Sequence, residues 1–190
     1  MKLSGSYQIN LEKQKVWEAL NDPEILQKTI PGCEEFIKKS ETEFTATATN
    51  KIGPFNASFT GDIELTDLNP PHSYKITGSG NSPVGIANGE ATVSLEDEDN
   101  GTKLTYTVEA NVGGKIAQVG SRLIDMTAKK MADIFFGKFS ELVSSDQDDK
   151  KTIEENIEKI EVPSQKKSQN KTLIYISIAI FAAVAVYLII

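Results

Sequence analysis

Side chains capable of nucleophilic, acid–base or metal chemistry are scarce in this sequence. Among its 190 residues there is one cysteine, Cys33, and one histidine, His72. A single Cys excludes an intramolecular disulfide and a thiolate metal cage, and a single His excludes a multi-histidine metal site. His72 follows Pro70-Pro71 in a predicted turn, where we expect a solvated side chain. Cys33 follows Pro31-Gly32 with no obvious base nearby, so we interpret it as a small buried residue. We therefore predict no catalytic residue and no metal site.

The other candidates are charged residues. Arg122 is the only arginine, and its planar guanidinium suits a partner's carboxylate or a polar ligand head better than a lysine would. The alternative for Arg122 is an ordinary surface charge. We expect Asp125 and Asp133 on the solvated flank of a helix. The sequence has no glycine-rich dinucleotide motif, phosphate loop or zinc-ligand spacing. These residues favour contact with a partner or ligand over a reaction.

Hydrophobic periodicity predicts the elements that must position these residues. We expect a strand over 2–9, a short helix over 12–20 capped by Asn10, and a second short helix from Pro23 to about Thr29. A change in the parity of the apolar residues predicts a bulge near Ile86-Ala87. Apolar and polar residues alternate cleanly elsewhere, which is typical of an antiparallel sheet with one solvated face. The alternating segments are 43–49, 55–65, 74–76, 87–95 and 104–112.

One long helix, predicted over 115–143, must cover the inner face of this sheet. Together with two short helices it is expected to be too small to fill a strongly twisted sheet, which leaves an apolar cavity for a flat or lipophilic ligand. A fully packed core is the open alternative. We expect Trp17 to pack the first short helix onto the sheet, with ring stacking on a ligand as the alternative. The predicted ligand-binding residues come from the helix and from the strands: Val119, Leu123, Met126, Phe55, Phe59 and Ile86.

The end of the chain differs from the rest. In Leu173–Ile190, 17 of 18 residues are apolar and none is charged, and a helix of that length reaches about 27 Å, close to the hydrocarbon thickness of a bilayer. Lys166, Lys167 and Lys171 precede it, so the positive-inside rule predicts a single-pass tail anchor in the cell membrane with a cytoplasmic domain. A buried C-terminal helix is the alternative. The predicted organisation is a folded domain over 1–143, a charged linker with room for a short helix over 144–172, and the anchor over 173–190.

Charge is unevenly distributed between these parts. The net charge is −7, which argues against a nucleic-acid partner, since such proteins carry a basic face. Residues 1–150 hold 15 Lys and Arg against 23 Asp and Glu, a net charge of −8, while residues 151–190 hold 5 against 4. The mean hydropathy of −0.27 therefore averages an acidic domain, a polar linker and an apolar segment.

The predicted order of strand, two short helices, six strands and one long helix resembles the START / polyketide-cyclase-like (SRPBCC) helix-grip superfamily. This is an α+β fold in which a curved antiparallel sheet wraps a long C-terminal helix. Within the superfamily, residues 1–143 resemble the family of carbon monoxide dehydrogenase G-type accessory proteins. The strings that carry this resemblance are MKLSGSY (1–7), VWEALNDPE (16–24), IPGCE (30–34), Gly61-Asp62 and GGKIAQVGSRLI (113–124).

The resemblance implies a role. Such proteins accompany molybdenum hydroxylases of the carbon monoxide dehydrogenase type and are thought to recruit the soluble enzyme to the membrane. A helix-grip cavity further implies a bound quinone that takes the enzyme's electrons, with no covalent cofactor. The expected partners are thus the bilayer, a molybdenum hydroxylase complex and a lipophilic small molecule. The alternatives are a cyclase- or hydrolase-like enzyme of the same fold, a lipid-binding or transfer protein unrelated to molybdenum enzymes, and a scaffold whose acidic surface docks a basic partner.

Overall fold

The computed structural model describes residues 1–157 and, within them, side chains as far as Ser144. The expected α+β composition of an antiparallel sheet, two short helices and a long helix is confirmed. In chain order the elements are β1 (Lys2–Ile9), α1 (Lys13–Ala19), α2 (Pro23–Thr29), β2 (Cys33–Lys38), β3 (Glu43–Ile52), β4 (Phe55–Asn69), β5 (Ser73–Ser82), β6 (Gly85–Glu98), β7 (Gly101–Gly114), the 3-10 helix η1 (Ile116–Val119) and α3 (Ser121–Ile157).

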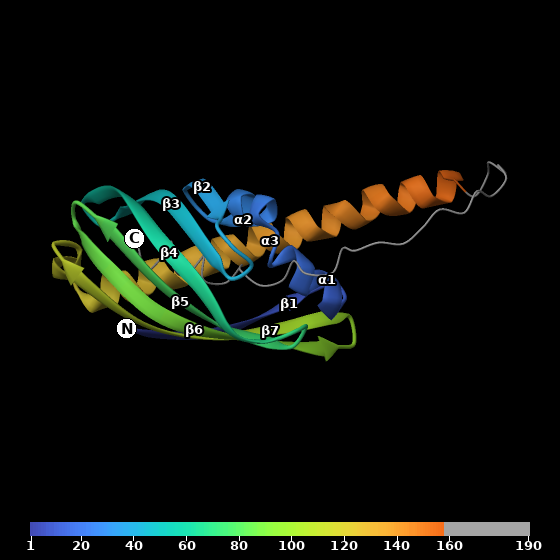
Figure 1. Ribbon diagram of the computed structural model, residues 1–190, viewed down its shortest axis with the longest axis horizontal. Helices are drawn as coiled ribbons and strands as arrows, with labels where there is room; N and C mark the ends of the chain where they lie inside the picture. The colour runs from blue at the N-terminus through green and yellow to red at the C-terminus, as the bar shows by residue number, and fades with distance from the viewer. Residues whose placement is uncertain (158–190) are drawn as a thin grey trace.

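All seven strands belong to one antiparallel sheet. Their order is β1-β7-β6-β5-β4-β3-β2, so β2 to β7 form a meander whose last strand, β7, pairs with the first strand of the chain, β1. The sheet curves around α3, while α1 and α2 connect the two edge strands (Figure 1). This helix-grip-like arrangement is the one that the resemblance implies.

Strand alternation builds the core on the inner face of the sheet. In β4, for example, Ala57, Phe59, Ile63 and Leu65 are buried, whereas the polar residues between them are exposed. The middle of α3 covers this face through three phenylalanines, Phe135, Phe136 and Phe139, none more than 2% exposed. Each such side chain contributes about 1.5–3 kcal/mol relative to an exposed one. The contribution of α3 to the core therefore comes from Ala128 to Val143.

The long helix differs from the prediction at its start. We expected a single helix from Lys115, but the chain forms η1 first and α3 begins at Ser121. Gly120 separates the two with a φ of +91°, a conformation that side chains with a Cβ rarely adopt. At its other end α3 continues to Ile157, inside the range 144–172 that the sequence predicts to be a linker.

The prediction of a bulge near Ile86-Ala87 was wrong. β6 keeps an unbroken register with both β5 and β7 along its length. Ala87 is buried on the inner face, and Ile86 therefore lies on the outer face, where it is 51% exposed. The parity change arises because Val84 belongs to the β5–β6 turn, where strand alternation does not decide which side chains pack against the core.

Of the two short helices, only α2 begins as its start signal predicts. α2 begins at Pro23 as predicted, and the Asp22 carboxylate caps it by accepting hydrogen bonds from the backbone N–H groups of Glu24 and Ile25 at 2.8 and 3.3 Å. The prediction that Asn10 caps α1 was wrong, because Glu12 occupies the N-cap position and makes no side-chain capping hydrogen bond.

In the part of the chain that the structure describes, no helix combines the length and the apolar composition needed to cross a membrane. The predicted anchor over 173–190 and its flanking Lys166, Lys167 and Lys171 lie outside the described residues.

Candidate functional site

The six predicted ligand-binding residues differ widely in exposure. Phe59 is fully inside the core at 1%, whereas Phe55 and Val119 are half-buried at its edge. Leu123 and Met126 on α3 are exposed at 36% and 62%, and Ile86 is exposed on the outer face. Ile86 therefore does not line the inner face with the others, which corrects its assignment to the cavity wall.

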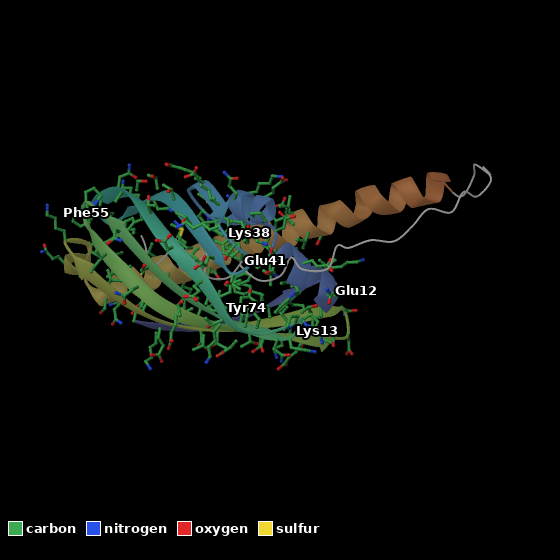
Figure 2. All side chains as sticks on the ribbon, in the orientation of Figure 1. Glu12, Lys13, Lys38, Glu41, Phe55 and Tyr74 are labelled. Atoms are coloured by element: carbon green, nitrogen blue, oxygen red, sulfur yellow. The ribbon has the colours of Figure 1, made fainter. Side chains whose placement is uncertain are left out.

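The first turns of α3 lie against the β3–β4 turn. A Cβ placed on Gly53 in that turn would come within 3.1 Å of Leu123 Cδ2 and 3.6 Å of Val119 Cγ1. Phe55 opens β4 two residues after Gly53 and lies at the same end of the molecule (Figure 2). The structure thus brings Val119 and Leu123 together beside the β3–β4 turn and places Phe55 at the same end.

Packing along α3 changes abruptly at Ala128. No residue from Ser121 to Thr127 is buried, whereas buried side chains recur at helical spacing from Ala128 to Val143. At the same end of the sheet the inward positions hold small residues, namely Ala57 in β4, Ala87 in β6 and Ala110 in β7. Val119 in η1 and Ile124 in the first turns of α3 are only partly buried against the core, so this end is where an apolar ligand between helix and sheet would lie.

A separate pocket of about 480 Å³ lies on the outer face of β3, β4 and β5. Lys39 Nζ lies 2.7 Å from Asp62 Oδ1 there, and the Thr45 hydroxyl donates to the same oxygen at 2.8 Å. Hydrogen bonding from Lys39 and Thr45 holds the pKa of the Asp62 carboxyl below its usual range. This pocket is polar and contains none of the six predicted residues; its lining is Lys39, Glu43, Phe44, Asp62, Ile63, Glu64, Thr77, Gly78 and Ser79.

Sequence reasoning missed a tyrosine cluster between β1, β7 and α3. The Tyr7 hydroxyl donates to Asp133 Oδ1 at 2.5 Å, and the Tyr7 ring stacks on Phe136 with centroids 4.0 Å apart. Tyr106 also stacks on Phe136, and its ring lies over Gly5, where a Cβ would clash with it. Burial, followed by the hydrogen bond to Asp133, raises the pKa of Tyr7, and burial raises that of Tyr106. Both phenols are therefore protonated at neutral pH and can donate a hydrogen bond but cannot act as a base.

Over residues 5–144 the sequence matches the CoxG family, described as the G component of carbon monoxide dehydrogenase. The chain belongs to the CoxG family. Apart from residues 1–4, all the strings that carried the resemblance fall inside this match. No curated protein matches the sequence.

Solved structures similar to this CoxG-family chain include a conserved protein from Geobacillus kaustophilus. The two are 33% identical with a TM-score of 0.73, over 76% of this chain and 96% of that one. A Mycobacterium smegmatis protein is 18% identical with a TM-score of 0.56, over 74% and 89% of the two chains. A Thermus thermophilus protein is 14% identical with a TM-score of 0.59, over 76% and 98%. The last two show the fold alone.

One of the CoxG-like strings now has a structural explanation. In IPGCE, Gly32 has a φ of +70°, and its Cβ would collide with the Thr49 carbonyl oxygen. Asn50 Nδ2 donates to the Pro31 carbonyl oxygen at 2.9 Å, which joins the exit of α2 to β3. Cys33, half-buried at the start of β2, donates its thiol to the Glu35 carbonyl oxygen at 3.4 Å. Burial raises the pKa of the Cys33 thiol to about 11, so it is a thiol and not a thiolate at neutral pH.

The remaining singled-out residues occupy the positions expected for structural or surface roles. Trp17 is fully buried and meets Tyr74 edge to face at 5.3 Å, which agrees with packing of α1 onto the sheet. His72 is exposed in the β4–β5 turn, and Asp125 and Asp133 lie on the solvated flank of α3. Arg122 is exposed at the start of α3, and its contact with a partner stays a prediction.

Proposed function

We propose that this CoxG-family chain is a membrane-anchored, non-catalytic accessory protein that brings a carbon monoxide dehydrogenase-type molybdenum hydroxylase to the membrane. The observation that carries the proposal is the family match over residues 5–144, which spans the folded domain. The apolar composition of Leu173–Ile190 supports the anchoring half.

Co-sedimentation tests this recruitment. The purified enzyme is mixed with membranes that carry either the full chain or a variant shortened to remove residues 173–190. We expect the enzyme to sediment with the membranes in the first case and to stay in the supernatant in the second. The proposal fails if the full chain leaves the enzyme in solution, or if the shortened chain itself sediments to the same extent.

We further propose that the domain binds a lipophilic ligand, with a quinone as the candidate, between the first turns of α3 and the sheet. Support comes from the exposed Leu123 and Met126 on turns of α3 where Ile124 is partly buried against the core and no residue is fully buried. A quinone ring and its isoprenoid chain would bury apolar surface that this segment leaves in water, worth about 25 cal/mol for each Å². The half-buried Phe55 and Val119 would form the neighbouring walls.

Mass spectrometry of an organic extract of the purified full chain tests the ligand. We expect an isoprenoid compound in near-stoichiometric amount, and a marked loss in Leu123→Gln and Met126→Gln. Ile37→Gln is the matched control, because Ile37 is also an exposed apolar residue, at 44%, but lies on β2. An extract without any isoprenoid or lipid contradicts this half of the proposal and leaves the recruitment half standing.

A further inference from the structure

Three segments meet at the end of the molecule where α3 starts, and we call this end the tip. Because the strands form a meander, the β3–β4 turn, the β5–β6 turn and the passage from β7 to α3 all fall at the same end of the sheet. Figure 1 shows these segments at the left, far from the end of α3. The tip is defined here by residues 50–56, 81–88 and 111–126.

The tip concentrates exposed apolar side chains. Among the described residues five large hydrophobic side chains are exposed, and Ile86, Leu123 and Met126 of these belong to the tip, at 51%, 36% and 62%. They project from different segments, one from the start of β6 and two from the start of α3. Three of the five exposed large hydrophobic side chains of the described residues therefore lie at this end of the domain, Ile86 on the outer face of the sheet and Leu123 and Met126 on α3.

The charge of the tip is opposite to that of the whole chain. Its segments contain Lys51, Lys115 and Arg122, all exposed, against a single acidic residue, Asp125. None of the three cations forms an ion pair with a described residue. The net charge of the chain is −7, and the opposite end carries the consecutive acidic residues 96–99 (Glu-Asp-Glu-Asp). The domain is therefore polarised along its length, with a basic, apolar tip and an acidic far end.

We propose that the tip is an interfacial contact site for an anionic lipid bilayer. Cations interleaved with exposed Ile, Leu and Met are the composition that lies at the boundary of headgroups and acyl chains. The apolar side chains project separately from the start of β6 and the start of α3, a shape that a deformable lipid surface accepts more readily than a protein partner does. An anionic surface attracts the tip and repels the acidic far end, which orients the domain tip-down. The inference needs neither the ligand nor the enzyme of the proposed function.

Position-specific fluorescence tests this contact. An environment-sensitive fluorophore is attached to the full chain through Ile86→Cys, Met126→Cys or, as the control at the acidic end, Glu98→Cys, in a Cys33→Ala background. The probe positions are exposed, so unchanged thermal unfolding is expected for each. The readout is a blue shift and protection from iodide quenching. Binding itself is not the readout, because residues 173–190 could hold the chain on vesicles whatever the tip does.

The expected result depends on lipid charge. In vesicles of phosphatidylcholine mixed with phosphatidylglycerol, the probes at positions 86 and 126 should shift and become protected, while the probe at position 98 stays accessible. Phosphatidylcholine alone should give a weaker effect. Each of Lys51→Gln, Lys115→Gln and Arg122→Gln should lower, by about fivefold, the equilibrium constant for passage of the probe from the accessible to the protected state. Lys15→Gln, at an exposed lysine on α1 at the far end, should leave it unchanged.

Several results would overturn the proposal. The probes at positions 86 and 126 could remain as accessible as that at position 98, or all three could become protected equally, which would indicate unspecific adsorption. The tip lysine and arginine variants could behave like Lys15→Gln. Protection that appears on adding a molybdenum hydroxylase without vesicles, and not with vesicles alone, would assign the tip to a protein partner instead.

Discussion

At the scale of single residues, the best-defined polar contact on the inner side is the bond from the Tyr7 hydroxyl to Asp133. It joins β1 to α3 across 126 residues of sequence. The stacked rings of Tyr7 and Phe136 fix the position of the hydroxyl, and the exposed Asp133 carboxylate needs little desolvation to accept it. The bond therefore connects α3 to the edge strand β1 at a small cost in desolvation free energy. Its role is structural and not acid–base.

The linkage between Tyr7 ionisation and folding can be measured. Because the pKa of Tyr7 is raised on folding, its contribution is fully present below the unfolded value of about 10 and is lost as pH rises above it. Tyr7→Phe keeps the ring and should lower the free energy of unfolding by about 0.5–1.5 kcal/mol at pH 8. Urea titrations should show this difference shrinking above pH 10. A difference that grows with pH would contradict the assignment. Asp133→Asn is the control, because it changes the acceptor and keeps the Tyr7 hydroxyl.

Cys33 offers a second measurement at this scale. Its thiol pKa of about 11 means that the thiolate is scarce at pH 8, and thiolate is the form that reacts with alkylating reagents. The rate of reaction with iodoacetamide should still rise steeply between about pH 9 and pH 10, beyond the range of an exposed thiol. The urea-unfolded protein is the reference and should level off at lower pH. A folded-state profile that follows the unfolded one would show that burial does not protect this thiol.

At the scale of elements, α3 has two parts with different roles. From Ala128 to Val143 its apolar side chains fill the core through Phe135, Phe136 and Phe139, whereas from Ser121 to Thr127 no side chain is fully buried and Ile124 packs only partly against the core. Gly120 and η1 set the angle at which the helix leaves β7. Residues 128–143 of α3 thus stabilise the fold, and the exposed side chains of residues 121–127 are left for contact with a ligand or a bilayer.

Paired truncations test this division of α3. Phe139→Ala removes a fully buried ring and should lower the free energy of unfolding by about 3–5 kcal/mol. Met126→Ala removes a side chain that is 62% exposed and should change it by no more than about 0.5 kcal/mol. Chemical denaturation of both variants gives the comparison. Similar losses in the two would mean that the first turns of α3 belong to the core after all.

The elements were largely predictable from the sequence, but their contacts were not. Period-two alternation and the Pro23 start signal depend on local geometry; they gave α2 and β3 to β7, whereas no alternating segment was assigned to β2. Ile86 was misplaced because Val84, in a turn, is held by tertiary packing and does not follow the strand period. The bond between Tyr7 and Asp133 depends on how α3 rotates against β1, which packing over the whole sheet decides.

At the scale of the whole molecule, the sheet separates an apolar inner face from an acidic outer one. The register aligns exposed residues from six strands in one row across the outer face, in which Glu43 faces Glu64 and Glu90 faces Glu109. Thr77 lies between the two pairs, and Lys2, 2.5 Å from Glu109, ends the row. The sequence predicted a net negative domain, but only the register shows that like charges stand directly opposite each other.

This row predicts that the acidic surface lowers the stability of the domain. Directly opposed like charges on neighbouring strands are destabilising by about 0.2–1 kcal/mol, so Glu64→Gln should raise the free energy of unfolding by that amount at low salt. The gain should shrink as salt screens the repulsion between Glu43 and Glu64. Glu35→Gln is the matched control, because Glu35 is also an exposed strand glutamate but faces Thr47, and it changes the net charge equally. Urea titrations at low and high salt separate the two. An equal gain in both variants would assign the effect to net charge, whereas a gain confined to Glu64→Gln would show that the chain keeps an unfavourable carboxylate pair on a surface where a basic partner would relieve it.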